Sequence, residues 1–278
     1  MSNYIAMIYK RYVEKRALII IIALFVIFSN LQASDSIYRI PSKLSDLDSK
    51  ALWVENQYLL DSTSIDSIFS FSKNNSINML FLKVRDNGEA YYNSDIVCKN
   101  DSLKINNFDP LQYAINKIEQ DSLKIKLIAW LDIYKLWDLN YYPTQLLSEE
   151  TNEMSHFYYQ CPECLDADET GRPDSKIQLD ILQSRDWDGI YLAPTHPHVN
   201  FYIMNIIADI ILNYKVSGFY LDNVHYQDFY YGYNEQGINE FESINSFTPL
   251  DFYRGIISEV YGYSEEEVNN NREIWDTF

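Results

Sequence analysis

Residues 216–226, Val-Ser-Gly-Phe-Tyr-Leu-Asp-Asn-Val-His-Tyr, decide the fold. Apolar and aromatic residues fill this stretch up to Asp222, which predicts a short buried strand with a carboxylate at its C-terminal end. Upstream, residues 202–214 carry isoleucines at helical spacing, so a helix leads into the strand. A helix followed by a strand with a terminal acid is typical of βα-barrels, where acids in this position are catalytic.

The preceding sequence has the same rhythm. We expect strands at 51–59, 77–84 and 125–133, and helices at 64–72 and from Asp109 onward. Asp109-Pro110 favours a helix start because Asp caps the helix and Pro suits its first position. The alternation predicts an α/β fold of TIM-barrel-like parallel βα units joined by right-handed crossovers.

A long insertion at 137–194 interrupts this rhythm after the third strand. A segment of this length is usually a functional loop or carries small elements of its own. Residues 187–192 look like a short added strand. We expect the insertion to lie over the mouth of the barrel.

The number of strands predicts an incomplete (β/α)8 barrel, truncated at its C-terminus. Strand candidates near residues 51, 77, 125 and 216 make four, whereas a closed barrel needs eight. The remainder, 234–278, offers no further set of strands, and 271–278 looks like the start of a helix. We therefore expect exposed sheet edges, self-association, and little or no activity from this chain alone.

Composition indicates a globular protein. The 278 residues are 47% hydrophobic, and 22 basic against 40 acidic residues give a net charge of −18. This charge repels phosphate backbones, so nucleic acid is excluded as a partner. The acidic residues are spread along the chain, which favours a solvated surface over an acidic functional patch.

The N-terminus has the pattern of an export signal. Basic residues precede the apolar run 17–28, and Ala33 follows it. We expect a signal peptide at 1–33, an irregular leader at 34–50 and the barrel domain at 51–278. This arrangement predicts export to the periplasm, cell surface or extracellular space. The alternative is an uncleaved membrane anchor, although the run is shorter than the roughly 20 residues that span a bilayer.

Several blocks of sequence, taken in order, carry a family resemblance. They are VRDNGEAYYNS (84–94), DPL (109–111), IAWL (128–131), YLAP (191–194), NY (213–214) and LDNVHY (221–226). Together they resemble the glycosyl-hydrolase-like 10 family, which implies a bacterial TIM-barrel glycosidase over about 51–226. Ser217 and His225 stand where the family usually has Asp and often Arg. Gln120 and Asp121 stand where it commonly has His.

Glycoside hydrolysis predicts what the site must contain. It needs two carboxyl groups, about 5–5.5 Å apart for retention of configuration and about 6.5–9.5 Å for inversion. Asp222 is the first, and its place also resembles that of the nucleophile of α-amylase-like barrels. The alternative is that Asp222 caps the next segment or pairs with Arg85. The second carboxyl is not identified, since Asp132 and Glu89 fit solvated or ion-paired residues better.

Candidate substrate-binding residues surround Asp222. Arg85 either holds a sugar hydroxyl or orients Asp222, or else it forms a structural salt bridge. Trp130, on the third strand, fits the core, while Tyr134 and Trp137 can present flat faces to the C–H side of a sugar ring. An aromatic cluster after Asp222 either lines a sugar cleft or packs a long loop; it comprises Tyr226, Phe229, Tyr230, Tyr231 and Tyr233. The complete set of substrate-binding candidates is Arg85, Trp130, Tyr134, Trp137, His196, Asn223 and Tyr226.

Cysteine and histidine residues do not predict a metal centre. Cys161 and Cys164 fit a local disulfide or two free thiols, and a redox role would need a thioredoxin-like context that the sequence lacks. Cys98 fits a buried thiol. His196 and His198 are spaced like a pair of ligands, but two prolines surround them and no third ligand is near in sequence. We expect neither a metal nor a cofactor.

The sequence therefore predicts a glycoside hydrolase acting on a poly- or oligosaccharide through paired carboxylates, impaired by truncation. The alternative is a non-catalytic carbohydrate-binding or cell-envelope interaction protein that keeps an aromatic barrel mouth. A carboxylate opposite Asp222 separates the two.

Overall fold

The computed structural model describes residues 49–137, 156–177, 187–228 and 230–277. They belong to one compact unit, Ser49–Phe278. The expected signal peptide at 1–33 and nearly all of the leader at 34–50 lie outside the described residues. Among those described, none of the helices has the length and apolar character needed to cross a membrane.

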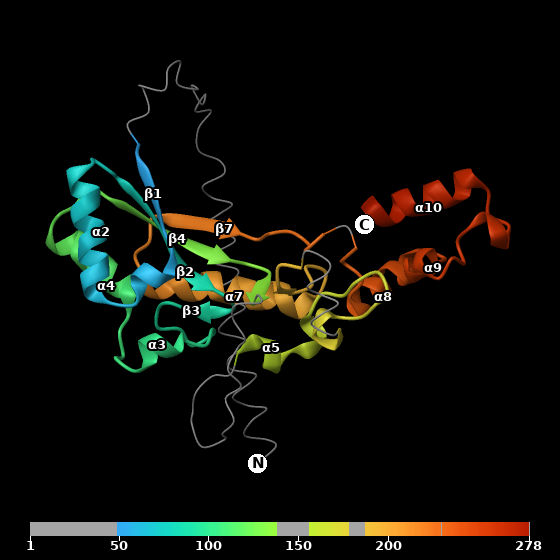
Figure 1. Ribbon diagram of the computed structural model, residues 1–278, viewed down its shortest axis with the longest axis horizontal. Helices are drawn as coiled ribbons and strands as arrows, with labels where there is room; N and C mark the ends of the chain where they lie inside the picture. Colours follow the sequence, from blue (N-terminus) through green and yellow to red (C-terminus); the bar gives the residue numbers. More distant parts are fainter. Residues whose placement is uncertain (1–48, 138–155, 178–186, 229, 278) are drawn as a thin grey trace, which may run out of the picture. The chain divides into compact units, whose positions relative to one another are not determined.

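A parallel sheet forms the centre of the unit (Figure 1). Its strands follow the order β1 (Ala51–Val54), β2 (Met79–Asp86), β4 (Lys126–Asp132) and β7 (Gly218–Asp222), and each neighbouring pair is parallel. A short strand, β3 (Glu89–Ala90), runs antiparallel to β2. The predicted parallel βα units are confirmed, and the described residues form an open sheet of a partial TIM-barrel-like fold.

Three helices connect the parallel strands and cover one face of the sheet. They are α2 (Ser62–Asn74), α4 (Pro110–Gln120) and α7 (Pro197–Asn213) (Figure 1). Alternate residues of β4, such as Leu127 and Leu131, are buried in the same hydrophobic core as the apolar sides of these helices. The capping prediction for α4 is confirmed, because Asp109 Oδ1 accepts the Gln112 N–H at 2.9 Å and Pro110 is the first helical residue.

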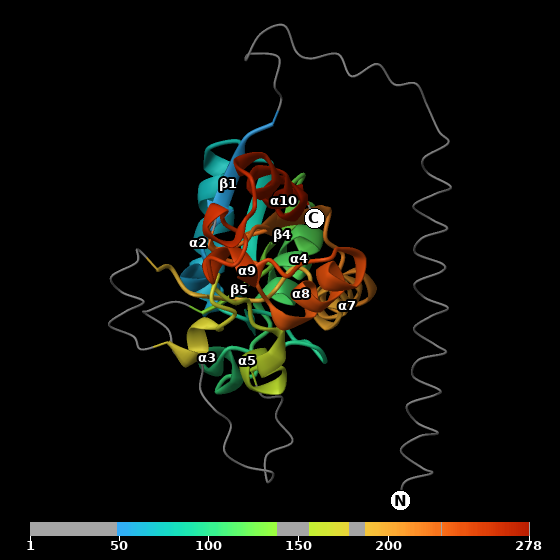
Figure 2. The same cartoon turned by 90° about the vertical axis from the view of Figure 1, so that its right-hand side faces the viewer.

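The remaining elements either have at most four residues or come after β7 in the sequence. No strand lies between 223 and 277 among the described residues, and Figure 2 shows the late helices of this part of the chain. The other elements are η2 (Asn56–Leu59), α3 (Asp101–Lys104), β5 (Lys135–Trp137), α5 (Phe157–Gln160), η3 (Pro162–Cys164), η4 (Asp174–Lys176), β6 (Ile190–Tyr191), α8 (Glu235–Ile244), α9 (Leu250–Tyr253), η5 (Glu259–Tyr261) and α10 (Glu265–Thr277).

Three sequence predictions need correction at their boundaries. The strand expected at 51–59 stops at Val54, where the chain turns into η2. The added strand expected at 187–192 is β6, two residues that pair antiparallel with β5. The helix start expected at 271–278 lies inside α10, which begins at Glu265. Much of the insertion at 137–194 lies outside the described residues.

A β-bulge near the end of β2 separates two basic side chains. The pairing of β2 with β4 shifts between Lys83, which is opposite Trp130, and Arg85, which is opposite Leu131. Without the bulge, Lys83 and Arg85 would share a face, because strand side chains alternate. With it, Lys83 lies on the face away from the helices and Arg85 lies on the helix side.

Candidate active site

The C-terminal ends of the parallel strands gather four acidic residues, which we call the carboxylate edge. Glu55 follows β1, and Asp86, Asp132 and Asp222 end β2, β4 and β7. Parallel strands bring these ends to the same edge of the sheet. Asp132 and Asp222 are partners in the pairing of β4 with β7, and adjacent strands lie about 4.8 Å apart. Asp222 therefore has a second acid directly beside it.

Lys83 joins three members of the carboxylate edge. Its Nζ lies 2.8 Å from Asp86 Oδ1, 3.4 Å from Asp132 Oδ2 and 3.8 Å from Glu55 Oε2. Burial lowers the pKa of Lys83, but the neighbouring carboxylates, Asp132 foremost, outweigh burial and raise it above its ordinary value. Lys83 is therefore a fixed positive charge. Its position in an otherwise apolar strand was a signal that the sequence analysis missed.

Asp132 is the most perturbed acid of the edge. Only 2% of its surface is exposed, and its Oδ1 has no hydrogen-bond partner. Burial raises the pKa of Asp132 to about 7, against the opposing attraction of Lys83 and with further help from Asp86. A carboxyl group that keeps a proton near neutral pH has the chemistry of a general acid.

Asp222 is held at both carboxylate oxygens. The Trp130 indole N–H donates to Oδ2 at 2.9 Å, and the Asn223 backbone N–H donates to Oδ1 at 3.0 Å. Asn223 adopts a left-handed backbone conformation with φ 51°, which Asn tolerates better than most residues. This turn redirects the chain immediately after the carboxylate. Asp222 itself is partly exposed.

Backbone pairing continues beyond the two strand ends. The Ile133 N–H donates to the Asp222 carbonyl at 2.8 Å, and the Tyr134 N–H donates to the Asn223 carbonyl at 3.3 Å. The predicted site residues Asp222, Trp130, Asn223 and Tyr134 are therefore brought together.

Arg85 lies on the other face of the sheet from this group. Its side chain is fully buried, donates to the backbone carbonyls of Asp132 and Ile133, and lies 5.8 Å from the centre of the Tyr202 ring on α7. Arg85 supports the end of β4 from the helix side. A sugar could reach it only after rearrangement of the sheet or of α7.

The other predicted substrate-binding residues are distributed unevenly. Trp137 is buried, with Trp187 at 5.5 Å and Tyr158 at 6.0 Å between ring centroids, so neighbouring rings cover it. His196 is buried and is the N-cap of α7, where its Nδ1 accepts the His198 N–H at 3.2 Å. Tyr226 is 39% exposed, in the segment that follows Asp222.

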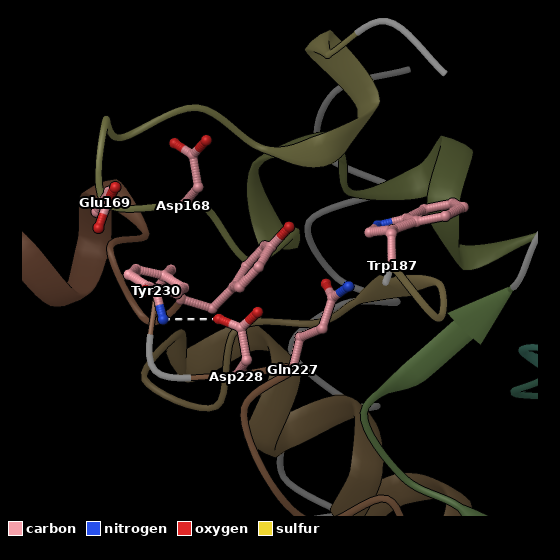
Figure 3. Close-up of a pocket in the computed structure, with 7 residues that line it drawn as sticks. Asp168, Glu169, Trp187, Gln227, Asp228 and Tyr230 are labelled. Atoms are coloured by element: carbon pink, nitrogen blue, oxygen red, sulfur yellow. Dashed lines mark hydrogen bonds between the residues drawn. The ribbon is translucent and has the colours of Figure 1, made fainter. Parts of the chain in front are cut away.

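A pocket of about 320 Å³ lies beside that segment (Figure 3). Acidic and aromatic side chains share its wall, and the Tyr230 N–H donates to Asp228 Oδ1 at 2.6 Å. Of the predicted aromatic cluster, Tyr230 and Tyr231 line the pocket and Phe229 is outside the described residues. The lining residues are Asp168, Glu169, Trp187, Gln227, Asp228, Tyr230 and Tyr231.

Two buried acids support the pocket wall. Asp174 accepts hydrogen bonds from the Trp187 indole N–H and the Tyr231 hydroxyl, both at 2.6 Å. Asp166 accepts the N–H groups of Ala167 and Gly232 on one oxygen, while its Oδ2 has no partner. Burial raises the pKa of Asp166 to about 8. These contacts tie the insertion to the segment after β7.

The three cysteines form one disulfide and one buried free thiol. Cys161 and Cys164 form a disulfide, the first of the two alternatives for this pair. Cys98 is a buried free thiol, as expected, and burial raises its pKa to about 12.

Parallel βα units with acids at their C-terminal strand ends are consistent with a partial TIM-barrel-like fold. The model of one family, Glycosyl hydrolase-like 10, matches residues 48–251, and the chain belongs to this family. The resemblance found in the sequence is thereby confirmed.

Known proteins show more distant similarity. Glycosyl hydrolase DigH of Escherichia coli (strain K12) is 25% identical over 162 residues, which are 55% of this chain and 32% of that protein. The chain thus spans about a third of the length of the curated relatives it matches.

Two solved structures are similar in part. A hypothetical protein from Ruminiclostridium thermocellum ATCC 27405 gives a TM-score of 0.44 at 12% identity, covering 73% of this chain and 91% of that one. An uncharacterized Listeria monocytogenes EGD-e protein, in complex with glucose, magnesium and calcium, gives 0.36 at 14% identity, covering 63% and 16%.

Proposed function

We propose that the chain acts on a glycosidic bond of a poly- or oligosaccharide through Asp222 and Asp132. Family membership supports a glycosyl-hydrolase-like function. The observation that carries the residue assignment is the pairing of these two acids on adjacent strands. One is fixed by hydrogen bonds to both oxygens, and the other keeps a proton near neutral pH.

The proposed reaction has two steps. Asp222 forms a bond to the anomeric carbon while the bond to the leaving oxygen breaks. Asp132 gives that oxygen its proton, which requires the segment over this 2% exposed carboxyl group to move aside when the substrate binds. Water then attacks the same carbon, Asp132 takes a proton from the water, and Asp222 is released. Asp132 and Asp222 are direct partners on neighbouring strands, so we expect their carboxyl groups to lie nearer the roughly 5–5.5 Å of retaining enzymes than the ~6.5–9.5 Å of inverting ones, and we expect retention of configuration.

The test compares isosteric variants on a panel of bacterial and plant polysaccharides, with reducing-sugar release as the readout. Asp222→Asn and Asp132→Asn should each lower turnover by about 10²–10⁴-fold, since Asn supplies neither charge nor proton. Asp101→Asn, an exposed acid on α3, is the matched control. Full turnover by a folded Asp222→Asn variant would remove Asp222 from the mechanism.

A second candidate function is carbohydrate binding without catalysis. The sheet face away from the helices carries a row of aromatic rings, which we call the aromatic row: Trp53, Phe81, Tyr220 and Trp130. Trp53 stacks on Phe81 with ring centroids 4.4 Å apart, and Tyr220 lies edge-on to Phe81 at 5.6 Å. Trp53 is 51% exposed and Tyr220 37%. Exposed aromatic rings suit the apolar faces of sugars.

Binding and hydrolysis can be measured separately. Trp53→Ala should weaken oligosaccharide binding about 10-fold, measured by calorimetry, if the aromatic row holds the sugar. Tyr261→Ala, which removes an exposed ring of η5, is the control. Binding without any hydrolysis would favour this second function over the first.

We also propose that the chain is exported. The proposal rests on the basic residues, apolar run and Ala33 of the N-terminal sequence. N-terminal sequencing of protein from the cell envelope should give a mature start near Ser34. Retention of Met1 in the membrane fraction would indicate an anchor instead.

A further inference from the structure

Two cysteines and a histidine from separate segments converge away from the carboxylate edge. The ligand atoms of Cys161, Cys164 and His198 all lie within 4.8 Å of one another. Cys161 is the N-cap of η3, Cys164 is its last residue, and His198 is in the first turn of α7. We call these three residues the sulfur–imidazole cluster. His198 lies more than thirty positions after the cysteines in the sequence, so the fold creates the cluster.

Backbone hydrogen bonds hold the two segments together. The Ala193 N–H donates to the Cys164 carbonyl at 2.8 Å, and Leu165 forms an antiparallel bridge with Leu192. The Asn234 side chain also donates to the carbonyls of Glu163 and Leu165, at 2.9 and 2.8 Å. The positions of the cluster residues are therefore fixed by the surrounding fold and do not depend on the bond between the sulfurs alone.

The exposure of the cluster residues and the charge of their neighbours are suitable for binding a metal cation near the surface. Cys161 and Cys164 are buried, whereas His198 is exposed and closes the cluster on the solvent side. Glu163, an exposed acid between the cysteines, adds negative charge. His196 is close, with Nδ1 3.7 Å from Cys164 Sγ, but this nitrogen already accepts the His198 N–H. We therefore count three protein ligands.

We propose that, once the disulfide is reduced, Cys161, Cys164 and His198 bind one zinc ion. Tetrahedral zinc has Zn–S bonds of about 2.3 Å and Zn–N bonds of about 2.0–2.1 Å, which place the ligand atoms roughly 3.5–3.8 Å from one another. The three atoms already lie within 4.8 Å, so the change needed is a separation of the two sulfurs after the bond between them breaks. Water or another small ligand takes the fourth position, as in other sites with two cysteines and one histidine.

The electrons and protons balance with a dithiol as the reductant. The dithiol gives two electrons and two protons, the Cys161–Cys164 bond breaks to give two thiols, and the dithiol becomes a disulfide. Zinc then displaces both thiol protons into solvent. The disulfide and the zinc-bound form exclude each other, so the metal content of the chain follows the redox state of its surroundings.

Cobalt titration of the full chain tests this proposal, because a thiolate–cobalt bond has a characteristic absorption band. The chain reduced with a phosphine should bind one Co²⁺ with this band and lose it on addition of Zn²⁺, whereas the oxidised chain should show no band. Cys161→Ser or Cys164→Ser should weaken binding about 100-fold or more, and His198→Ala about 10-fold. Cys98→Ala and His225→Ala, outside the cluster, should bind as the unaltered chain does.

Three results would overturn the proposal. They are the absence of a thiolate–cobalt band in the reduced chain, equal binding by the oxidised and reduced chains, and unchanged affinity of the His198→Ala variant. His198 is exposed, so this variant decides even if a serine variant fails to fold. A thermal melt of each protein verifies folding before titration.

Discussion

The indole N–H of Trp130 on β4 donates to Asp222 Oδ2 on β7 at 2.9 Å. The same ring lies 5.0 Å from Lys83 Nζ, which in turn contacts Asp86 and Asp132. One aromatic side chain thereby connects the partly exposed carboxylate of Asp222 to the charges of Lys83, Asp86 and Asp132. The orientation of Asp222 consequently depends on a residue that the sequence analysis had grouped with sugar-binding aromatics.

Replacing Trp130 should separate orientation from chemistry. Trp130→Phe removes the hydrogen bond to Asp222 while keeping a ring, so a stability loss of about 1–2 kcal/mol is expected. If Asp222 is the proposed nucleophile, kcat should fall about 10-fold or more with little change in KM. Urea unfolding and steady-state kinetics measure the two effects. An unchanged kcat in a folded variant would mean that this bond does not position the carboxylate.

Asp166 should make stability depend on pH. Burial raises its pKa to about 8 in the folded chain, whereas an unfolded Asp titrates near about 3.9. The folded state thus keeps a proton that the unfolded state releases, and stability from this group is complete below about pH 4 and is lost as the pH rises to about 8.

The isosteric Asp166→Asn variant cannot lose this proton. Its stability relative to the unaltered chain should increase between pH 5 and pH 8, by up to about 1.4 kcal/mol per pH unit. Urea unfolding at both pH values provides the measurement. Glu266→Gln, an exposed change on α10, is the matched control. A difference that is identical at both pH values would contradict a proton held by Asp166.

Truncating the Trp137 side chain should lower the free energy of unfolding. Its ring is 7% exposed and packs against Trp187 and Tyr158. Trp137→Ala should therefore cost about 3–5 kcal/mol of unfolding free energy, in contrast to Tyr58→Ala, which truncates a ring that is 51% exposed. Equal losses in the two variants would show that the Trp137 ring is not part of the core. Chemical denaturation distinguishes the outcomes.

Asp109 links three segments of the chain. Besides capping α4, it accepts the Tyr214 hydroxyl at 2.7 Å and the Asn93 N–H at 3.1 Å. Asp109→Ala should cost about 1–2 kcal/mol and Tyr214→Phe about 1 kcal/mol. The double variant should lose less than the sum by about 0.5 kcal/mol or more. Strict additivity would mean that the two residues act independently.

The sequence predicted those features that depend on neighbours along the chain. Residues 216–226 predicted a strand with a terminal acid, because apolar continuity and a strand-end carboxylate are local signals. The predicted burial of this strand was wrong, since β7 lies at the edge of the described sheet and leaves Tyr220 37% and Leu221 43% exposed. Asp109-Pro110 predicted the start of α4 for the same reason. The carboxylate edge follows once the strands are taken to be parallel, since their C-terminal ends must then meet.

Features that depend on register or on distant segments could not be predicted in this way. A one-residue bulge determines which face of the sheet Arg85 occupies, and the amino-acid types of residues 83–85 do not predict this bulge. Trp137 is covered by Trp187, fifty positions later. The sequence analysis did not propose His198 as a metal ligand, because no third ligand lies near it in the sequence. In the fold, Cys161 and Cys164 lie beside it.

The bulge in β2 also lets two basic residues, two positions apart, act on opposite sides of the sheet. Lys83 serves the acidic network, while Arg85, two positions later, serves the helix layer. A change of charge at Lys83 alters the electric field at the strand ends and leaves the packing of α7 intact. The two side chains thus hold Asp132 from opposite faces of the sheet, Lys83 at its carboxylate and Arg85 at its backbone carbonyl.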